Sequence, residues 1–194
     1  MKDIEESNEF IKQNMEACYN KFSEELKKEE NLFHNKIRIE NSSKKNKLIK
    51  LYNLADKILE QTKEFLPCQK GCSHCCYINV SITILEAEYI ERNTGIKFRK
   101  LLTSKSYDNN KFLGITCPFL KNNTCTIYKY RPFACRKHMS FDKDTFWCEI
   151  KNFNDKKITM GSFDYEKSYY DITQYSGNTI YGDIRDFFGN KNEE

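Results

Sequence analysis

The first third of the chain carries apolar residues at the spacing of amphipathic helices. One apolar stripe runs over residues 3–35 and a second over residues 43–65, each within a highly charged segment. No proline or glycine interrupts either stripe, and the Asn-Ser-Ser sequence at 41–43 is typical of a turn followed by a helix N-cap. The pattern predicts an antiparallel N-terminal helical hairpin that ends at Pro67. Its apolar face would be a scaffold for the rest of the chain or, alternatively, a surface that binds a partner protein or dimerises.

A shorter helix is predicted in the middle of the chain. Thr83 and Glu86 form a Thr-x-x-Glu capping box, in which each side chain binds a main-chain amide at the helix start. The expected helix covers residues 84–93, and Gly95 is placed to end it in the left-handed conformation. Capping and a solvated helix face explain Glu86 and Glu88 better than a pair of catalytic carboxylates does.

The second half of the chain shows weaker patterns. Residues 103–116 are mostly polar and predict a loop, and the Asn-Asn pair at 122–123 predicts a turn. The C-terminal third predicts only a final helix near residues 179–188. Aromatic residues of that third are typical of core packing: Phe163, Tyr165, Tyr169, Tyr170, Tyr175 and Tyr181.

The cysteines are the most informative feature of the sequence. Four of the nine fall between positions 68 and 76, and two of these are neighbours. Thiolates spaced three or four residues apart on a glycine-containing loop can converge on one cation without straining the backbone. The candidate metal ligands are Cys68, Cys72, Cys75, Cys76, Cys117, Cys125, Cys135 and Cys148. Cys18 lies on the first apolar stripe and is expected to be a buried structural cysteine.

The number of thiols leaves the metal open. Eight thiolates would suit two four-thiolate sites, or one iron–sulfur cluster and one mononuclear site; seven would leave an open position or recruit His74 or His138. Zinc and iron–sulfur clusters both take cysteine thiolates, so the spacing does not separate the two. Adjacent cysteines tend to point their side chains apart, which would let Cys75 and Cys76 serve different metal sites.

Three other interpretations of the cysteines compete with metal binding. Disulfides need an oxidising compartment, whereas the N-terminus lacks the apolar stretch of a signal peptide and the number of cysteines is odd. Buried structural cysteines do not suit the polar loop at 71–76. Cys68, Cys72 and Cys75 have the spacing of the radical-SAM motif, but the flanking sequence does not alternate between strands and helices as that fold requires.

Aromatic and cationic residues surround the later cysteines. The side chains expected to wall the site and lower its dielectric constant are Phe119, Tyr128, Tyr130 and Phe133. Arg131 and Arg136 flank Cys135, and their charges would offset the negative charge of several thiolates or bind the cofactor. A role for Arg131 in binding an anionic substrate is the alternative.

A known family carries the same motifs in the same order. The motifs are G-C-x-x-C-C at 71–76, C-P-F-L at 117–120 and C-x-I-Y-x-x-R-P-x-x-C-R at 125–136, and the segment at 80–86 matches as well. Residues 68–138 thus resemble the YkgJ-type cysteine-cluster family, a CxxCxxCC zinc- or iron-chelating domain. The chain departs from the family pattern at Cys68, which lies four rather than three residues before Cys72.

The resemblance implies metal binding through these cysteines. Relatives in the cysteine region are flagellin lysine N-methylases, which are thought to carry an iron–sulfur cluster. The resemblance therefore implies two functions: a zinc or Fe–S module with a structural, metal-supplying or redox role, or an Fe–S-containing enzyme that modifies proteins, such as a protein lysine methyltransferase. The sequence contains no glycine-rich cofactor loop and no clear acid–base pair, so it leaves enzymatic activity undecided.

Composition limits the size of the apolar core. At 39% hydrophobic and 31% charged, the 194 residues supply little apolar material for a core, and thiolate–metal bonds would add on the order of 10 kcal/mol or more to folding. We expect a mainly α protein with a small, irregular, cysteine-rich metal-binding core. The expected domains are an N-terminal helical hairpin at 1–66, a cysteine-cluster core at 67–150 and an aromatic-rich segment at 151–194 that packs on the core.

Charge and hydropathy indicate the surroundings of the protein. The net charge of +4, from 32 basic and 28 acidic residues, is too small to indicate nucleic-acid binding. No apolar run is long enough to cross a membrane. Free thiols and the lack of a signal peptide predict a reducing, cytoplasmic location.

Overall fold

The computed structural model describes residues 2–69, 71–108, 110–153, 158, 165–174 and 179–189. The chain forms two compact units, each built from two stretches of sequence. We call residues 1–70 with 136–172 the helical unit, and residues 71–135 with 173–194 the cysteine unit. Helices predominate in the described residues and the strands have only two or three residues each, which confirms the mainly α class. The three domains expected at 1–66, 67–150 and 151–194 stay a prediction.

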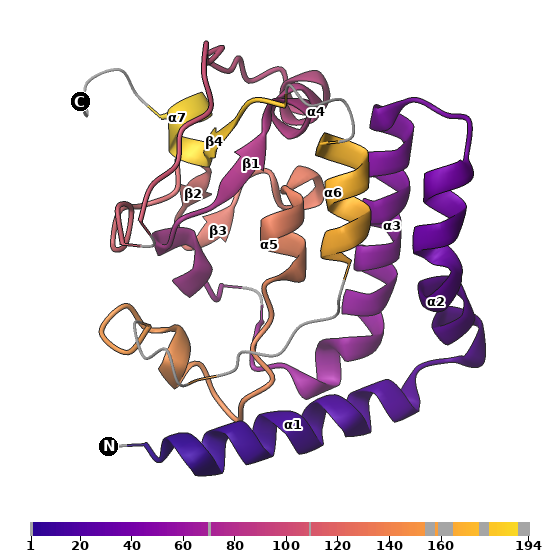
Figure 1. Ribbon diagram of the computed structural model, residues 1–194. Helices are drawn as coiled ribbons and strands as arrows, with labels where there is room; N and C mark the ends of the chain where they lie inside the picture. Colours follow the sequence, from indigo (N-terminus) through magenta and orange to yellow (C-terminus); the bar gives the residue numbers. More distant parts are fainter. Residues whose placement is uncertain are drawn as a thin grey trace. The chain divides into compact units, whose positions relative to one another are not determined.

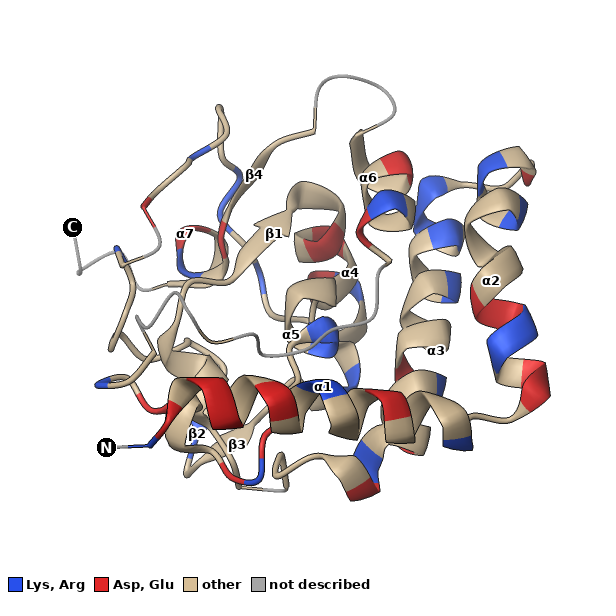
Figure 2. Ribbon diagram, turned by 60° about the horizontal axis from the view of Figure 1, so that its bottom comes forward, with Lys and Arg blue, Asp and Glu red and all other residues tan. Residues whose placement is uncertain are grey.

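Three helices open the helical unit. They are α1 (Ile4–Lys21), α2 (Glu24–Ile39) and α3 (Lys44–Thr62), followed by the short 3-10 helix η1 (Lys63–Phe65). Figure 1 shows α2 and α3 side by side, with α1 running across their axes. Acidic side chains outnumber basic ones along α1, whereas α2 and α3 carry both signs of charge (Figure 2).

The single helix expected over residues 3–35 is wrong, because the chain breaks between α1 and α2. Phe22 leaves the helical conformation, and Ser23 is extended with its side chain accepting a hydrogen bond from the Leu26 amide over 3.2 Å. A hydroxyl N-cap followed by two glutamates is a strong helix start. The apolar stripe continues across the break, with Phe22 and Leu26 both buried, so periodicity alone did not reveal it.

The remaining stretch of the helical unit is irregular around its short helices. It holds the 3-10 helix η4 (Phe146–Cys148) and most of α6 (Glu166–Gln174). The Trp147 indole donates to Ser7 Oγ over 3.0 Å, and the Asn14 amide donates to the carbonyl oxygens of Phe65 and Phe141, both over 2.8 Å. These polar contacts attach residues 136–153 to α1, and Asn14 also joins α1 to η1.

The cysteine unit consists of short elements around one small core. These are η2 (His74–Tyr77), β1 (Ser81–Thr83), α4 (Ile84–Thr94), β2 (Leu120–Lys121), β3 (Thr124–Cys125), η3 (Tyr128–Tyr130), β4 (Tyr181–Asp183) and α7 (Ile184–Phe188). The helix α5 (Phe133–Lys137) begins in this unit. Strand β1 pairs antiparallel with β4 in the register Ile82 opposite Gly182, and each strand runs directly into a helix (Figure 1).

Several local predictions are confirmed in this unit. Thr83 and Glu86 form the capping box of α4, and Gly95 ends the helix with φ 75°. Asn122 and Asn123 adopt φ values of 48° and 55° in the turn between β2 and β3. The described residues between 103 and 116 contain neither helix nor strand.

The C-terminal prediction needs a correction. The helix expected near residues 179–188 is shorter: its first part is β4, and only α7 is helical. Of the aromatic residues, Tyr165 is buried, whereas Tyr170 is 61% exposed and does not contribute to the core. Phe163 and Tyr175 lie outside the described residues. None of the helices that the structure describes is long and apolar enough to cross a membrane.

Candidate metal centre

Six of the eight candidate ligands lie in the cysteine unit, on separate pieces of chain. Cys72 lies in the loop after Gly71, Cys75 and Cys76 in η2, Cys117 in the loop before β2, Cys125 at the end of β3 and Cys135 in α5. The elements that carry them are short, so specific main-chain contacts must hold them in place.

The double cysteine is presented by a tight turn. Gly71 has φ 94°, a conformation that residues with a side chain rarely adopt. The Cys76 amide donates to the Ser73 carbonyl oxygen over 2.9 Å and closes the 3-10 turn of η2. The expectation that Cys75 and Cys76 point apart and serve different metal sites stays a prediction.

Cys117 is attached to the double cysteine through the main chain. Its amide donates to the Cys76 carbonyl oxygen over 2.8 Å, and the Gly114 amide donates to the Tyr77 carbonyl oxygen over 2.7 Å. The Cys117 carbonyl oxygen accepts in turn from the Leu120 amide over 3.0 Å at the start of the β2–β3 hairpin.

The hairpin returns Cys125 towards the segment that carries Cys117. Leu120 lies opposite Cys125 in the two-stranded sheet. The Thr126 amide and hydroxyl both donate to the Phe119 carbonyl oxygen, over 2.9 and 3.0 Å. The turn predicted at the Asn-Asn pair is therefore confirmed, and it brings Cys125 back towards the segment of Cys117.

A buried carboxylate fixes the approach to Cys135. Glu86, fully buried in α4, accepts from the Thr83 amide with Oε2 and from the Phe133 amide with Oε1, over 3.0 and 2.8 Å. Because Phe133 is the first residue of α5, the capping residue of α4 also determines where the helix of Cys135 begins. Glu86 thus has a structural role, in agreement with the preference drawn from the sequence.

The thiols share one apolar environment. Cys117 belongs to a buried cluster that includes Phe119, Ile127 and Phe187, and the partly buried residues packed against it include Cys76, Cys125 and Cys135. Of the expected aromatic wall, Phe119 and Phe133 are buried and Tyr130 packs on the cluster, whereas Tyr128 is 59% exposed. Apolar surroundings lower the local dielectric constant and exclude water from sulfur ligands.

Burial and the charges of neighbouring thiols both act on the pKa values of the cysteines in this unit. Burial raises the pKa of Cys117 and Cys125, and it raises the pKa of Cys135 well above the ordinary thiol value. The negative charges of Cys75, Cys117 and Cys125 raise the pKa of Cys135 further. The hydrogen bond to Cys75 raises the pKa of Cys76, and the charges of Cys75, Cys117 and Cys125 act in the same direction.

Cys75 is the exception in this group. The hydrogen bond from Cys76 lowers the pKa of Cys75 to about 7, burial opposes this, and the charge of Arg131 lowers the pKa further. One thiol with a lowered pKa among neighbours with raised pKa values is typical of a group of sulfurs that carries a single negative charge.

The two flanking arginines have different surroundings. Arg131 is buried, donates to the Tyr128 carbonyl oxygen over 2.8 Å and lies 4.0 Å from the centre of the Tyr128 ring. Its charge lowers the pKa of Cys75, Cys125 and Cys135. In the helical unit, the Arg136 guanidinium pairs with Asp56 and lies 4.3 Å from the Tyr52 ring centre.

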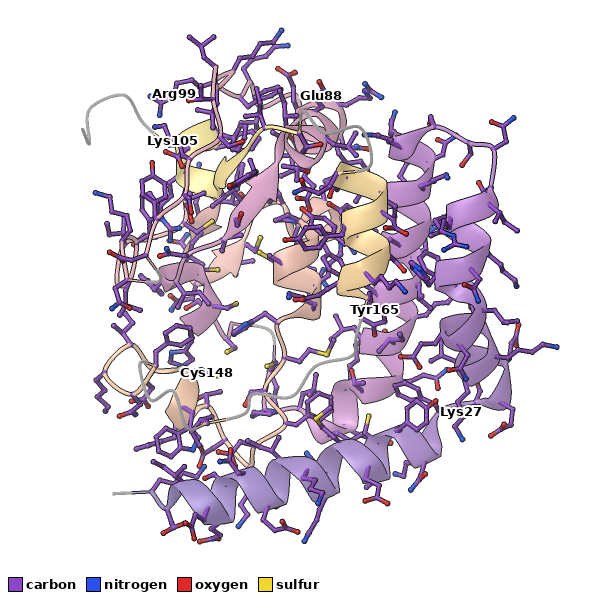
Figure 3. The ribbon with its side chains drawn as sticks, in the orientation of Figure 1. Lys27, Glu88, Arg99, Lys105, Cys148 and Tyr165 are labelled. Carbon is purple, nitrogen blue, oxygen red and sulfur yellow. The ribbon has the colours of Figure 1, made fainter. Side chains whose placement is uncertain are left out.

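The remaining candidates are placed as follows. In the helical unit, Cys68 is exposed, Cys148 (labelled in Figure 3) is buried in η4, and burial lowers the pKa of His138. His74 is the first residue of η2 in the cysteine unit. The structure therefore packs Cys76, Cys117, Cys125 and Cys135 together, with Cys75 next to Cys76 in the chain, and Cys72 lies three residues before Cys75.

The donor set fits a thiolate-bound metal. Within the ranges that the structure describes, no three His, Cys, Asp or Glu side chains already have their donor atoms arranged around a common ion. Metal binding releases the protons of the thiols that become ligands. Sulfur donors in apolar surroundings suit zinc and iron–sulfur clusters, whereas magnesium and calcium prefer oxygen.

Comparison with known proteins supports this class of site. Residues 67–159 match the model of the CxxCxxCC family, described as "Putative zinc- or iron-chelating domain". The match covers slightly less than half of the chain and supports metal binding by this segment. No curated protein and no solved structure matches the chain. The relation to flagellin lysine N-methylases stays an implication of the resemblance alone.

Proposed function

We propose that the cysteine unit is a thiolate metal centre with a structural or redox role. The proposed ligands are drawn from Cys75, Cys76, Cys117, Cys125 and Cys135. The observation that carries the proposal is that Cys76, Cys117, Cys125 and Cys135 come from four pieces of chain and pack in one buried cluster, with Cys75 next to Cys76 in the chain. Four thiolates complete a tetrahedral zinc site or hold a [4Fe–4S] cluster, and this group offers five.

The placement of the charged residues supports a module rather than an active site. Arg131 is engaged by the ring and the carbonyl oxygen of Tyr128, and Glu86 is engaged by two main-chain amides. A cavity of about 600 Å³ in the helical unit is lined by Lys21, Ser23, Glu60, Gln61, Lys63 and Glu64, and no cysteine lines it. No specific observation favours the enzymatic alternative.

The metal content of the purified protein tests the proposal. The protein is purified without oxygen, and zinc, iron, acid-labile sulfide and the visible spectrum are measured per chain. An iron–sulfur cluster gives a brown protein with broad absorption at roughly 400 nm, whereas zinc gives a colourless one. Either result supports a thiolate centre. A protein that takes up neither metal under reducing conditions contradicts the proposal.

Single substitutions assign the ligands. Ser replaces each of the five cysteines in turn, and Cys18→Ala is the matched control because Cys18 is fully buried in α1 of the helical unit. We expect four of the five variants to lose metal and the control to retain it. The same assay on Cys68→Ser, Cys72→Ser and Cys148→Ser decides whether these three also belong to the centre.

A further inference from the structure

Arg185 lies in a part of the chain that the family match does not cover. The match ends at residue 159, and Arg185 is the second residue of α7. Its side chain is only 8% exposed, although it carries a full charge. A buried guanidinium must be held by acceptors, so the identity of these acceptors indicates its role.

The acceptors are main-chain carbonyl groups of the ligand-bearing segments. Nη2 donates to the carbonyl oxygen of Cys76 over 3.3 Å and to that of Ile115, which lies two residues before Cys117. Nη1 donates to the Ile78 carbonyl oxygen over 3.2 Å. One planar side chain therefore binds the segment after the double cysteine and the segment before Cys117.

The same carbonyl oxygen connects the two ligands directly. Cys76 O accepts from the Cys117 amide as well as from Arg185. A carbonyl oxygen has two lone pairs and can accept both hydrogen bonds. Each bond restricts the rotation of the peptide group that carries this oxygen. The guanidinium thus stabilises the main-chain contact that joins Cys76 to Cys117.

Arg185 is itself fixed by its neighbours. Asp183 Oδ1 accepts from the Arg185 amide and from Nη1, both over 2.9 Å, while Asp183 Oδ2 accepts from the Val80 amide over 2.6 Å. The Phe112 ring centre lies 5.2 Å from the guanidinium carbon. A side chain already held by a carboxylate and an aromatic ring loses little further entropy when it binds the ligand segments.

We propose that Arg185 is a positioning residue of the metal centre, which holds the main chain of Cys76 and Cys117 in register for a common metal. The proposal rests on the proposed function and adds that residues beyond the matched domain complete the centre. Residues that orient metal ligands typically contribute about 10- to 100-fold to metal affinity. We therefore expect loss of the forked donor to weaken metal binding by at least about 10-fold.

Two substitutions and one control test the role. Arg185→Lys keeps the charge but cannot donate to two carbonyl groups at once, and Arg185→Met removes both functions. Lys105→Met is the control, because Lys105 (Figure 3) contacts α7 through Asp186 over 3.1 Å without touching a ligand segment. The full-length proteins are compared by competition with a chelator and by the visible spectrum of the cobalt(II)-loaded form, which reports the geometry of the sulfur ligands.

Hydrogen exchange adds a readout that needs no metal. In the metal-free protein, the Cys117 amide should exchange at least about 10-fold faster in Arg185→Lys than in the wild type or in Lys105→Met, because its acceptor is no longer held. An unchanged spectrum, affinity and exchange rate in Arg185→Lys would overturn the role of Arg185 while the centre stands. A wild-type protein without metal would instead overturn the proposed function, and the role of Arg185 with it.

Discussion

The amide of Cys117 donates a hydrogen bond to the carbonyl oxygen of Cys76 over 2.8 Å, although the two residues are far apart in sequence. This contact joins the double-cysteine turn to the Cys-Pro segment. A metal centre needs its sulfur atoms held within a few tenths of an ångström, which short irregular elements achieve only through such main-chain bonds. The predictions below concern the groups that support this arrangement.

Glu86 should be more important for folding than its position on an ordinary helix suggests. Glu86→Ala removes the acceptor of the Thr83 and Phe133 amides and leaves both donors buried. We expect a loss of about 3 kcal/mol in the free energy of unfolding, measured with urea on the metal-free protein. Glu88→Ala, on the exposed face of α4, should change it by less than about 0.5 kcal/mol. Equal effects of the two substitutions would contradict this role of Glu86.

Gly95 should stabilise the end of α4 because glycine adopts the left-handed conformation, and not because a larger side chain would clash. Its φ is 75°, and a Cβ atom placed there meets nothing within 4 Å. Gly95→Ala should therefore destabilise the protein by about 1 kcal/mol through backbone strain alone. Asn tolerates the left-handed conformation better, so Gly95→Asn should cost clearly less in the same unfolding experiment. A neutral Gly95→Ala would show that the helix ends differently.

The charge of Arg131 should lower the pKa of the Cys75 thiol. In the metal-free protein, Arg131→Met removes a charge that lowers the pKa of Cys75, so the alkylation of Cys75 at pH 7 should slow by roughly two- to fivefold. Alkylation is followed against pH, and mass spectrometry identifies the modified residue. Arg92→Met on the exposed face of α4 is the control and should leave the profile unchanged. An unchanged Cys75 profile in Arg131→Met would show that the arginine charge does not reach the sulfur.

The metal-free protein should lose stability at alkaline pH. Burial raises the pKa of Cys18 from 9.0 to about 11, and it raises the pKa of Cys135 well above 9.0. Above roughly pH 9 the unfolded chain releases these protons while the folded chain retains them, so the free energy of unfolding falls as the pH rises. Below that pH both states are protonated and the effect is absent.

Urea unfolding between pH 7 and pH 10.5 measures this dependence. Cys18→Ala should reduce the slope above pH 9 without abolishing it, because Cys135 still contributes. The metal-loaded protein should show a smaller slope, because its ligand thiolates have already released their protons. A free energy of unfolding that does not change up to pH 10.5 would contradict the burial of these thiols.

Local sequence signals predicted the local structure well. The capping box of Thr83 and Glu86, the helix end at Gly95 and the Asn-Asn turn each depend on neighbouring residues, and all three are confirmed. The break at Ser23 was missed because the apolar stripe continues across it, although a serine before two glutamates was the signal that could have revealed it.

Contacts between distant segments could not be predicted in the same way. Strands β1 and β4 have three residues each, too few to show an alternating pattern, and their pairing joins residues about 100 positions apart. The cysteine motifs indicated a metal site, but they carried no information about Arg185, whose acceptors are main-chain atoms that every residue has. The motifs also did not show which cysteines share a unit.

X-ray absorption spectroscopy at the zinc or iron edge tests the thiolate centre most directly. The purified full-length protein is measured beside Cys117→Ser, which changes one proposed ligand. We expect a first shell dominated by sulfur at about 2.3 Å in the wild type, with one sulfur fewer or no bound metal in the variant. A first shell made only of nitrogen and oxygen would contradict a centre built from these thiols. So would spectra that stay the same as the wild type in Cys117→Ser and in the Ser variants of the other four cysteines.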